Sequence, residues 1–256
     1  MTRAFFNQFR LGDCLWACHW LRHAALASPG DEFEFYCNET HHWQLAPVLE
    51  GVRVKLLPLS QYYGGGVDTW INADGLYPPK DRDLVKFLAE RFTRVAAKAG
   101  LAPILQKREE WLFDYPELWR YSERHFEDRG KVFWQVVDSI PQSGQFTQDA
   151  NALTSLIARL RGKYGNSQVS TTRDGLRQSD YDIPVTTYGK ISQTCNYILM
   201  ISTGPSWPTF NATTESRIKN RFILLHDKEF LNYGREWPHF SSVAACERHL
   251  ESINLI

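Results

Sequence analysis

Apolar residues recur along the first sixty positions with the periods of strands and helices. A short apolar and aromatic run at 4–9 predicts a strand. The next segment carries apolar residues at i, i+4 and i+7 spacing, which predicts a helix with one buried face; these residues are Cys14, Cys18, Leu21 and Ala25. Further patterns predict a strand at 32–37, a helix at 42–49 and a strand at 52–57.

The rest of the chain continues this alternation of strands and helices. A long amphipathic helix is predicted at 81–99, and the segment 107–129, rich in charge and aromatic residues without a clean period, predicts a linker. The pattern then predicts strands and helices in turn: strands at 132–137, 169–172, 198–202 and 222–225, and helices at 147–164, 191–197 and 243–253.

Strands that alternate with helices of this length favour βαβ units, because parallel strands need a crossover and the helix supplies it. We therefore expect an α/β fold made of two Rossmann-like domains with parallel sheets and a cleft between them. The N-terminal domain is expected over 1–125, and the C-terminal domain, which ends in a helix, over 126–256.

Composition narrows the class of protein. Hydrophobic residues make up 43% of the 256 positions and charged residues 23%, as in ordinary globular chains. Lys+Arg and Asp+Glu both number 29, so binding to nucleic acid would require a local patch. The five cysteines, an odd number, favour a reducing compartment. With no signal-like N-terminus and no apolar run of membrane-spanning length, we expect a cytoplasmic protein without a membrane span.

The first strand-to-helix connection contains the best candidate for chemistry. Ligands of doubly wound sheets bind beyond the carboxyl ends of the strands, and Leu11-Gly12-Asp13 is predicted to lie there. Gly12 lets the backbone approach a ligand, and the Asp13 carboxylate can accept a proton from a substrate hydroxyl. The alternative is that Asp13 caps the following helix, which aspartate does readily.

Two loops in the second half of the chain also follow directly after predicted strands. Ser202 to Ser206 follows an apolar strand, and a helix starting near Ser206 would offer its unpaired N–H groups to a phosphate. The loop 139–146, which contains Ser143 and Gly144, follows the first strand of this half and is a candidate cradle for part of a nucleotide. For both loops, a plain structural connection stays open as the alternative.

A histidine pair is a further candidate for metal binding, and aromatic residues are candidates for stacking. His19 and His23 have the i, i+4 spacing of two metal ligands, but no third ligand stands at motif spacing, so we expect no metal site. Stacking on a sugar ring or base would use aromatic residues such as Trp70, although core packing explains most of the nine tryptophans.

Two stretches together carry a resemblance to a known family. The segments FFNQFRLGDCLWACHWLR and YILMISTGPSWPTF resemble the heptosyltransferase-like family of GT-B glycosyltransferases. The resemblance implies that Asp13 is the base on an acceptor hydroxyl. It also implies that Thr203, Gly204 and Pro205 form a turn on the phosphate side of a nucleotide-sugar donor. Gly12, Ser143, Gly144 and Ser206 are further candidates for donor binding, from their places in the predicted loops.

The implied activity is a metal-independent glycosyl transfer to an acceptor hydroxyl. The N-terminal domain would be the acceptor side and the C-terminal domain the donor side, with the nucleotide sugar as a substrate and no cofactor. The acceptor stays open between a saccharide and a hydroxylated base in DNA. A third alternative is a nucleotide-binding module without catalysis, because Trp207 and Pro208 stand where the family usually has a histidine.

Overall fold

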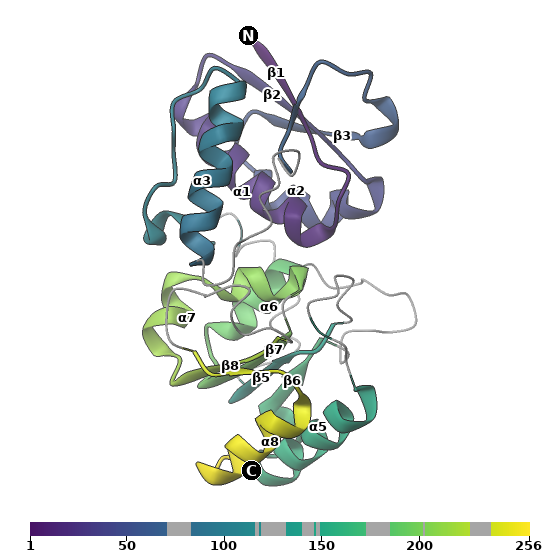
Figure 1. Ribbon diagram of the computed structural model, residues 1–256, viewed down its shortest axis with the longest axis vertical. Helices are drawn as coiled ribbons and strands as arrows, with labels where there is room; N and C mark the ends of the chain where they lie inside the picture. The colour runs from purple at the N-terminus through teal and green to yellow at the C-terminus, as the bar shows by residue number, and fades with distance from the viewer. Residues whose placement is uncertain are drawn as a thin grey trace. The chain divides into compact units, whose positions relative to one another are not determined.

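The computed structural model describes residues 1–70, 83–115, 118, 132–139, 146, 149–172, 185–201, 203–225 and 237–256. The described residues up to Leu118 form one compact unit, and those from Val132 onward form a second. Each unit is built around a parallel sheet of its own (Figure 1). The predicted α/β class with two parallel sheets is therefore confirmed.

Within the described residues, the sheet of the first unit has the strand order β3-β2-β1-β4, and every neighbouring pair is parallel. Helices α1 and α2 lie side by side (Figure 1). The elements are β1 (Thr2–Phe6), α1 (Leu11–Ala27), β2 (Glu32–Cys37), η1 (Glu39–His41), α2 (His42–Leu49), β3 (Val54–Pro58), η2 (Leu59–Gln61), β4 (Val67–Asp68), α3 (Leu84–Lys98) and η3 (Arg108–Trp111).

Aromatic side chains join the sheet to its helices in the first unit. Phe5 of β1 is fully buried and meets the ring of Trp20 of α1 edge-on, with ring centroids 5.6 Å apart. Trp20 in turn stacks on Phe92 of α3 at 5.4 Å. Large rings bury much apolar surface each, so these contacts hold both helices against the sheet.

The predicted linker at 107–129 is wrong where the structure describes it. Three aromatic residues of this segment, Trp111, Phe113 and Tyr115, are buried in the first unit. Trp111 also donates its indole N–H to the carbonyl oxygen of Leu105 at 2.7 Å. The segment lacks a helical period because its aromatic residues pack from irregular backbone and a short 3₁₀ helix, and periodicity cannot reveal that kind of burial.

The second unit, within its described residues, has the strand order β6-β5-β7-β8-β9, again with parallel pairs throughout. Helices α5 and α8 cover one face of this sheet, and α6 and α7 lie on the other (Figure 1). The elements are β5 (Trp134–Val137), α5 (Ala150–Tyr164), η4 (Asn166–Gln168), β6 (Val169–Thr171), α6 (Val185–Ser192), β7 (Tyr197–Ile201), η6 (Gly204–Thr209), α7 (Ala212–Arg217), β8 (Asn220–Leu224), β9 (His239–Phe240) and α8 (Val243–Ser252).

The helix predicted at 191–197 is wrong. Helix α6 occupies 185–192 instead, and Tyr197 already begins strand β7. The α6 sequence VTTYGKIS is rich in β-branched residues and contains a glycine, which are poor helix formers. Most of its side chains are nevertheless buried, so tertiary packing supplies what local propensity does not.

No helix in the described ranges is both long enough and apolar enough to cross a bilayer.

Candidate active site

The structure places Asp13 in the first turn of helix α1, whereas the sequence predicted it in the connection between the first strand and that helix. The first helical backbone bond runs from the Cys14 N–H to the Arg10 carbonyl at 3.0 Å, so Gly12 and Asp13 belong to the first turn of α1 and not to the connection before it. The connection itself is shaped by Asn7, whose Oδ1 accepts the backbone N–H of Phe9 at 2.9 Å. An asparagine makes this kind of turn through its side chain and needs no glycine there.

The alternative that Asp13 caps the helix is correct in part. The N-cap position is held by Arg10, and the Asp13 carboxylate accepts a hydrogen bond from the Arg10 backbone N–H. An acidic residue at the third helical position makes this contact in a capping box. The Asp13 side chain exposes 25% of its surface.

Two opposing effects set the protonation of Asp13. Burial is the larger effect and raises the pKa of the carboxyl, while the nearby Arg91 guanidinium lowers it, and the net result is a pKa above the ordinary value of 3.8. The Nη1 atom of Arg91 lies 3.9 Å from Oδ1 of Asp13. A carboxylate with a raised pKa is a stronger base while it stays ionised near neutral pH, which suits proton abstraction from a hydroxyl.

Side chains that follow adjacent strands contact one another and Arg91. Strands β1 and β4 are parallel neighbours, so the residues that follow them meet, and Asn7 donates its side-chain amide to Thr69 Oγ1 at 2.9 Å. The ring of Trp70 lies 5.0 Å from that of Phe9 between centroids, and the Arg91 guanidinium lies 4.2 Å from the Trp70 centroid. Trp70, a candidate for stacking, thus contacts the arginine that faces Asp13.

Arg91 was not among the predicted site residues. It lies on α3 three and four positions after Leu88 and Phe87 and four before Val95, so it interrupts the apolar face of an amphipathic helix. A charged residue on such a face is the signal that would have identified it.

In the second unit, the predicted turn lies where two parallel strands end. Thr203 precedes η6 and follows β7, while Ser139 follows the neighbouring strand β5. Their hydroxyl oxygens lie 2.5 Å apart, and both side chains are partly exposed. Ser139 is the first residue of the loop 139–146 that the sequence offered as a cradle, but its meeting with Thr203 was not predicted, because the order of strands in a sheet is not written in the sequence. Ser143 and Gly144 lie outside the described residues.

The turn offers fewer backbone donors than a long helix would. Ser206 is fully buried; its Oγ–H donates to the Thr203 carbonyl at 2.6 Å, and its N–H donates to the same oxygen at 3.0 Å. Pro205 has no N–H. Ser206 therefore holds the turn in shape from within, while Thr203, Gly204 and Pro205 remain partly exposed.

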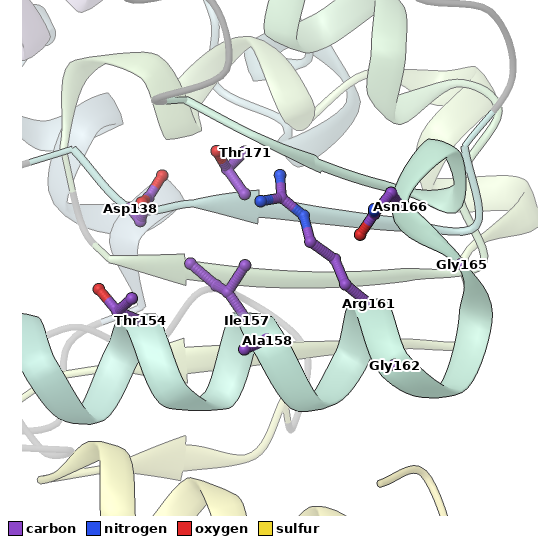
Figure 2. A pocket seen from close by; sticks show the side chains of 9 residues that line it. All are labelled: Asp138, Thr154, Ile157, Ala158, Arg161, Gly162, Gly165, Asn166 and Thr171. Carbon is purple, nitrogen blue, oxygen red and sulfur yellow. The ribbon is translucent and has the colours of Figure 1, made fainter.

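A groove of about 640 Å³ runs beside α5 in this unit, shown in Figure 2. The Arg161 side chain extends from α5 toward the strands, and Asp138 lies at the other end of the groove (Figure 2). Asp138 accepts hydrogen bonds from both the backbone N–H (3.0 Å) and the hydroxyl of Thr172, and its own N–H donates to Thr172 Oγ1 at 3.2 Å. Asp138 therefore joins the end of β5 to the end of β6 through these hydrogen bonds.

The histidine pair of α1 belongs to an aromatic cluster. His19 is fully buried, with its Nε2 2.9 Å from the Glu110 carbonyl oxygen and its ring 4.7 Å from that of Phe113. In the described part of the chain, no group of three or more His, Cys, Asp or Glu side chains is arranged to hold a metal ion. All five cysteines are buried free thiols.

Two α/β units, each with a parallel sheet, are the fold that this chain shares with solved GT-B heptosyltransferases. Among solved structures, the chain is similar to the E. coli heptosyltransferase WaaC with ADP-2-deoxy-2-fluoro heptose: TM-score 0.54, 12% identity, 99% of this chain and 100% of that chain covered. It is also similar to the E. coli ADP-heptose lps heptosyltransferase II: TM-score 0.52, 11% identity, 98% and 97% covered. No family model and no curated protein matches the chain.

Proposed function

We propose that this chain is a glycosyltransferase that moves a sugar from a nucleotide-sugar donor to an acceptor hydroxyl, with Asp13 as the general base. The observation that carries the proposal is the partly exposed Asp13 carboxylate, with its raised pKa, beyond the first strand of a heptosyltransferase-like fold. Fold similarity alone does not assign an activity, so the chemistry of the side chains must support it.

The proposed reaction begins at Asp13. The carboxylate takes the proton of the acceptor hydroxyl as the oxygen attacks the anomeric carbon, the new glycosidic bond forms, and the bond from that carbon to the diphosphate breaks. The contact with the Arg10 N–H fixes the carboxylate during this step. Because the pKa is raised, the carboxylate holds the proton more strongly than an ordinary exposed aspartate would.

The leaving diphosphate needs hydrogen-bond donors, and the second unit supplies candidates. The hydroxyls of Ser139 and Thr203 lie 2.5 Å apart and share a hydrogen bond; both are proposed to rotate and donate to phosphate oxygens when the diphosphate binds, with the partly exposed Gly204 backbone beside them. Donors aimed at charge that builds up on the leaving group lower the barrier of transfer. No residue set in the proposal requires a metal, so the reaction is proposed to be metal-independent.

The donor is proposed to be a nucleoside diphosphate sugar, with ADP sugars tested first because solved structures similar to this chain contain ADP or an ADP sugar. The test is a melting-temperature screen over nucleoside diphosphates and their sugar derivatives. A ligand at 100 times its Kd stabilises the folded state by about 2.7 kcal/mol, which raises the melting temperature by several degrees.

We expect one nucleoside diphosphate and its sugar to stabilise the wild-type chain, and to stabilise Ser139→Ala less. Ser216→Ala, which removes an exposed hydroxyl of α7, is the matched control and should behave as wild type. If no compound of the panel changes the melting temperature, the donor assignment fails. If a nucleotide sugar binds but is never consumed, the chain is a nucleotide-binding module and not a transferase.

A further inference from the structure

Arg91 is a buried cation with few partners. Its residue exposure is 4%, and its Nε donates one hydrogen bond, to the Thr69 carbonyl oxygen at 2.8 Å. Nη1 lies 3.9 Å from Asp13 Oδ1, which is beyond hydrogen-bond distance, and the buried Nη2 has no partner among the residues that the structure describes. The flat face of the guanidinium packs on Trp70.

Such an arrangement is a poor way to gain stability. Removing a guanidinium from water is unfavourable unless hydrogen bonds and a close counter-charge compensate for the lost hydration. Arg91 has one hydrogen bond and a loose ion pair, and burial lowers its pKa to about 10. It nevertheless stays protonated at neutral pH, so a positive charge is maintained at this strand end at the expense of stability.

The charged and titratable groups around the pair come from every neighbouring element. Arg10 faces Asp13 from the loop before α1, and Cys14 faces it from α1 itself. Asp68 faces Arg91 from β4, where it also accepts the Trp70 backbone N–H at 2.8 Å. Arg91 is the cation with the largest influence on Asp13, and at 5% side-chain exposure it is screened little by water.

We propose that Arg91 is a positioning residue that keeps the Asp13 carboxylate ionised and directed outward from the strand ends, ready to accept a proton. The proposal rests on the function proposed above, in which Asp13 is the base. Arg91 itself touches no reacting atom in this scheme. It acts through Asp13, and through the Trp70 ring that holds its guanidinium in place.

The direct test is a carbon-13 NMR titration of the Asp13 carboxyl in wild type, Arg91→Met and Arg91→Lys, with the signal assigned by its absence in Asp13→Asn. An opposite charge at this range depresses a carboxyl pKa by about one to three units. Loss of the charge in Arg91→Met should therefore raise the pKa of Asp13 by about one unit or more, and Arg91→Lys should restore most of the difference.

Arg94→Met is the matched control, because it removes an exposed arginine from the same helix, α3, three residues away. It should leave the Asp13 titration where it is in wild type. An unchanged Asp13 pKa in a folded Arg91→Met protein overturns the proposal. If Arg91→Met does not fold, Arg91→Gln, which is also uncharged but keeps a hydrogen-bond donor, decides: a raised Asp13 pKa supports the role of the charge, and a pKa equal to that of wild type overturns it.

Kinetics give a second, independent readout. With a working donor, the acidic limb of the turnover-against-pH profile should move to higher pH in Arg91→Met and stay near that of wild type in Arg91→Lys. A merely structural role would lower turnover equally at all pH values. Full turnover in Asp13→Asn would remove the proposed base, yet the NMR titration would still measure the coupling between Arg91 and Asp13, so the two failures are distinguishable.

Discussion

Each unit has an aspartate near the end of the first strand that the structure describes, and the two differ in position and surroundings: Asp138 follows β5 directly, whereas Asp13 lies in the first turn of α1. Asp138 is 1% exposed, and its Oδ1 accepts hydrogen bonds from both the N–H and the hydroxyl of Thr172, which joins the end of β5 to that of β6. Asp13 exposes a quarter of its side chain, its pKa is raised by burial, and its cation stands 3.9 Å away. Asp138 thus bonds within its own unit, whereas the Asp13 side chain is partly exposed and is the base in the proposed reaction.

The contrast extends to the surrounding side chains. In the first unit, burial lowers the pKa of His19 to about 3 and that of Arg91 to about 10. In the second, fully buried Arg221 has Glu215 at 2.8 Å and Thr209 Oγ1 at 2.6 Å. Arg221 thus has a close counter-charge, whereas the counter-charge of Arg91 lies 3.9 Å away.

The largest predicted effect is a loss of stability in acid that originates in the first unit. The pKa of His19 is lowered from 6.5 to about 3, so the unfolded chain binds a proton that the folded chain does not. Stability is therefore complete above pH 6.5 and is lost as pH falls toward 3, by about 3 kcal/mol between pH 7 and pH 4.

Urea unfolding of wild type and His19→Gln at these two pH values checks this prediction. Glutamine cannot take up the proton, so the variant should lose about 3 kcal/mol less than wild type over the same interval. Equal losses in the two proteins would show that His19 does not govern acid sensitivity.

The next prediction compares one substitution at the two aspartates. Asp138→Asn replaces charge-assisted hydrogen bonds by neutral ones and should lower the free energy of unfolding by roughly 1 to 2 kcal/mol. Asp13→Asn should not lower it at neutral pH. Because the folded-state pKa of Asp13 is raised, its ionisation removes stability as pH rises above the ordinary value of 3.8, and asparagine does not ionise.

Thermal melts of both variants at neutral pH and at pH 4 test this pair. A melting temperature that falls as far in Asp13→Asn as in Asp138→Asn would break the comparison, because it would make Asp13 a structural residue like its counterpart.

The smallest predicted effect concerns the hydroxyl pair of the second unit. Ser139→Ala and Thr203→Val each remove one neutral donor, worth about 1 kcal/mol, so the Kd for a nucleoside diphosphate should rise roughly fivefold. Isothermal titration calorimetry measures this, and unchanged affinity in both variants would place the diphosphate elsewhere.

Parts of this molecule could be read from its sequence because periodic burial is local information. The apolar patterns at 32–37 and 42–49 predicted strand β2 and helix α2 with the same first and last residues as in the structure. The two-residue strands β4 and β9 are too short to show a period, and α6 forms against its local propensities because it is buried.

The candidate site was predictable only in part, for a related reason. Asp13 stands in a short sequence motif, so its position could be found without the fold. The meeting of Ser139 with Thr203 depends on β5 and β7 being neighbours, and the meeting of Arg91 with Asp13 depends on how α3 packs. Contacts between distant segments come from the order of strands and the packing of helices, which no local pattern records.

The most direct test of the central claim is the release of nucleoside diphosphate from a saturating nucleotide sugar, with the same acceptor hydroxyl (water or an added saccharide) supplied to wild type, Asp13→Asn and Asp138→Asn. General-base catalysis contributes about 100- to 10,000-fold, so we expect turnover to fall by that factor in Asp13→Asn, with donor affinity unchanged, while folded Asp138→Asn keeps its activity. Turnover in Asp13→Asn equal to that of wild type would contradict the account.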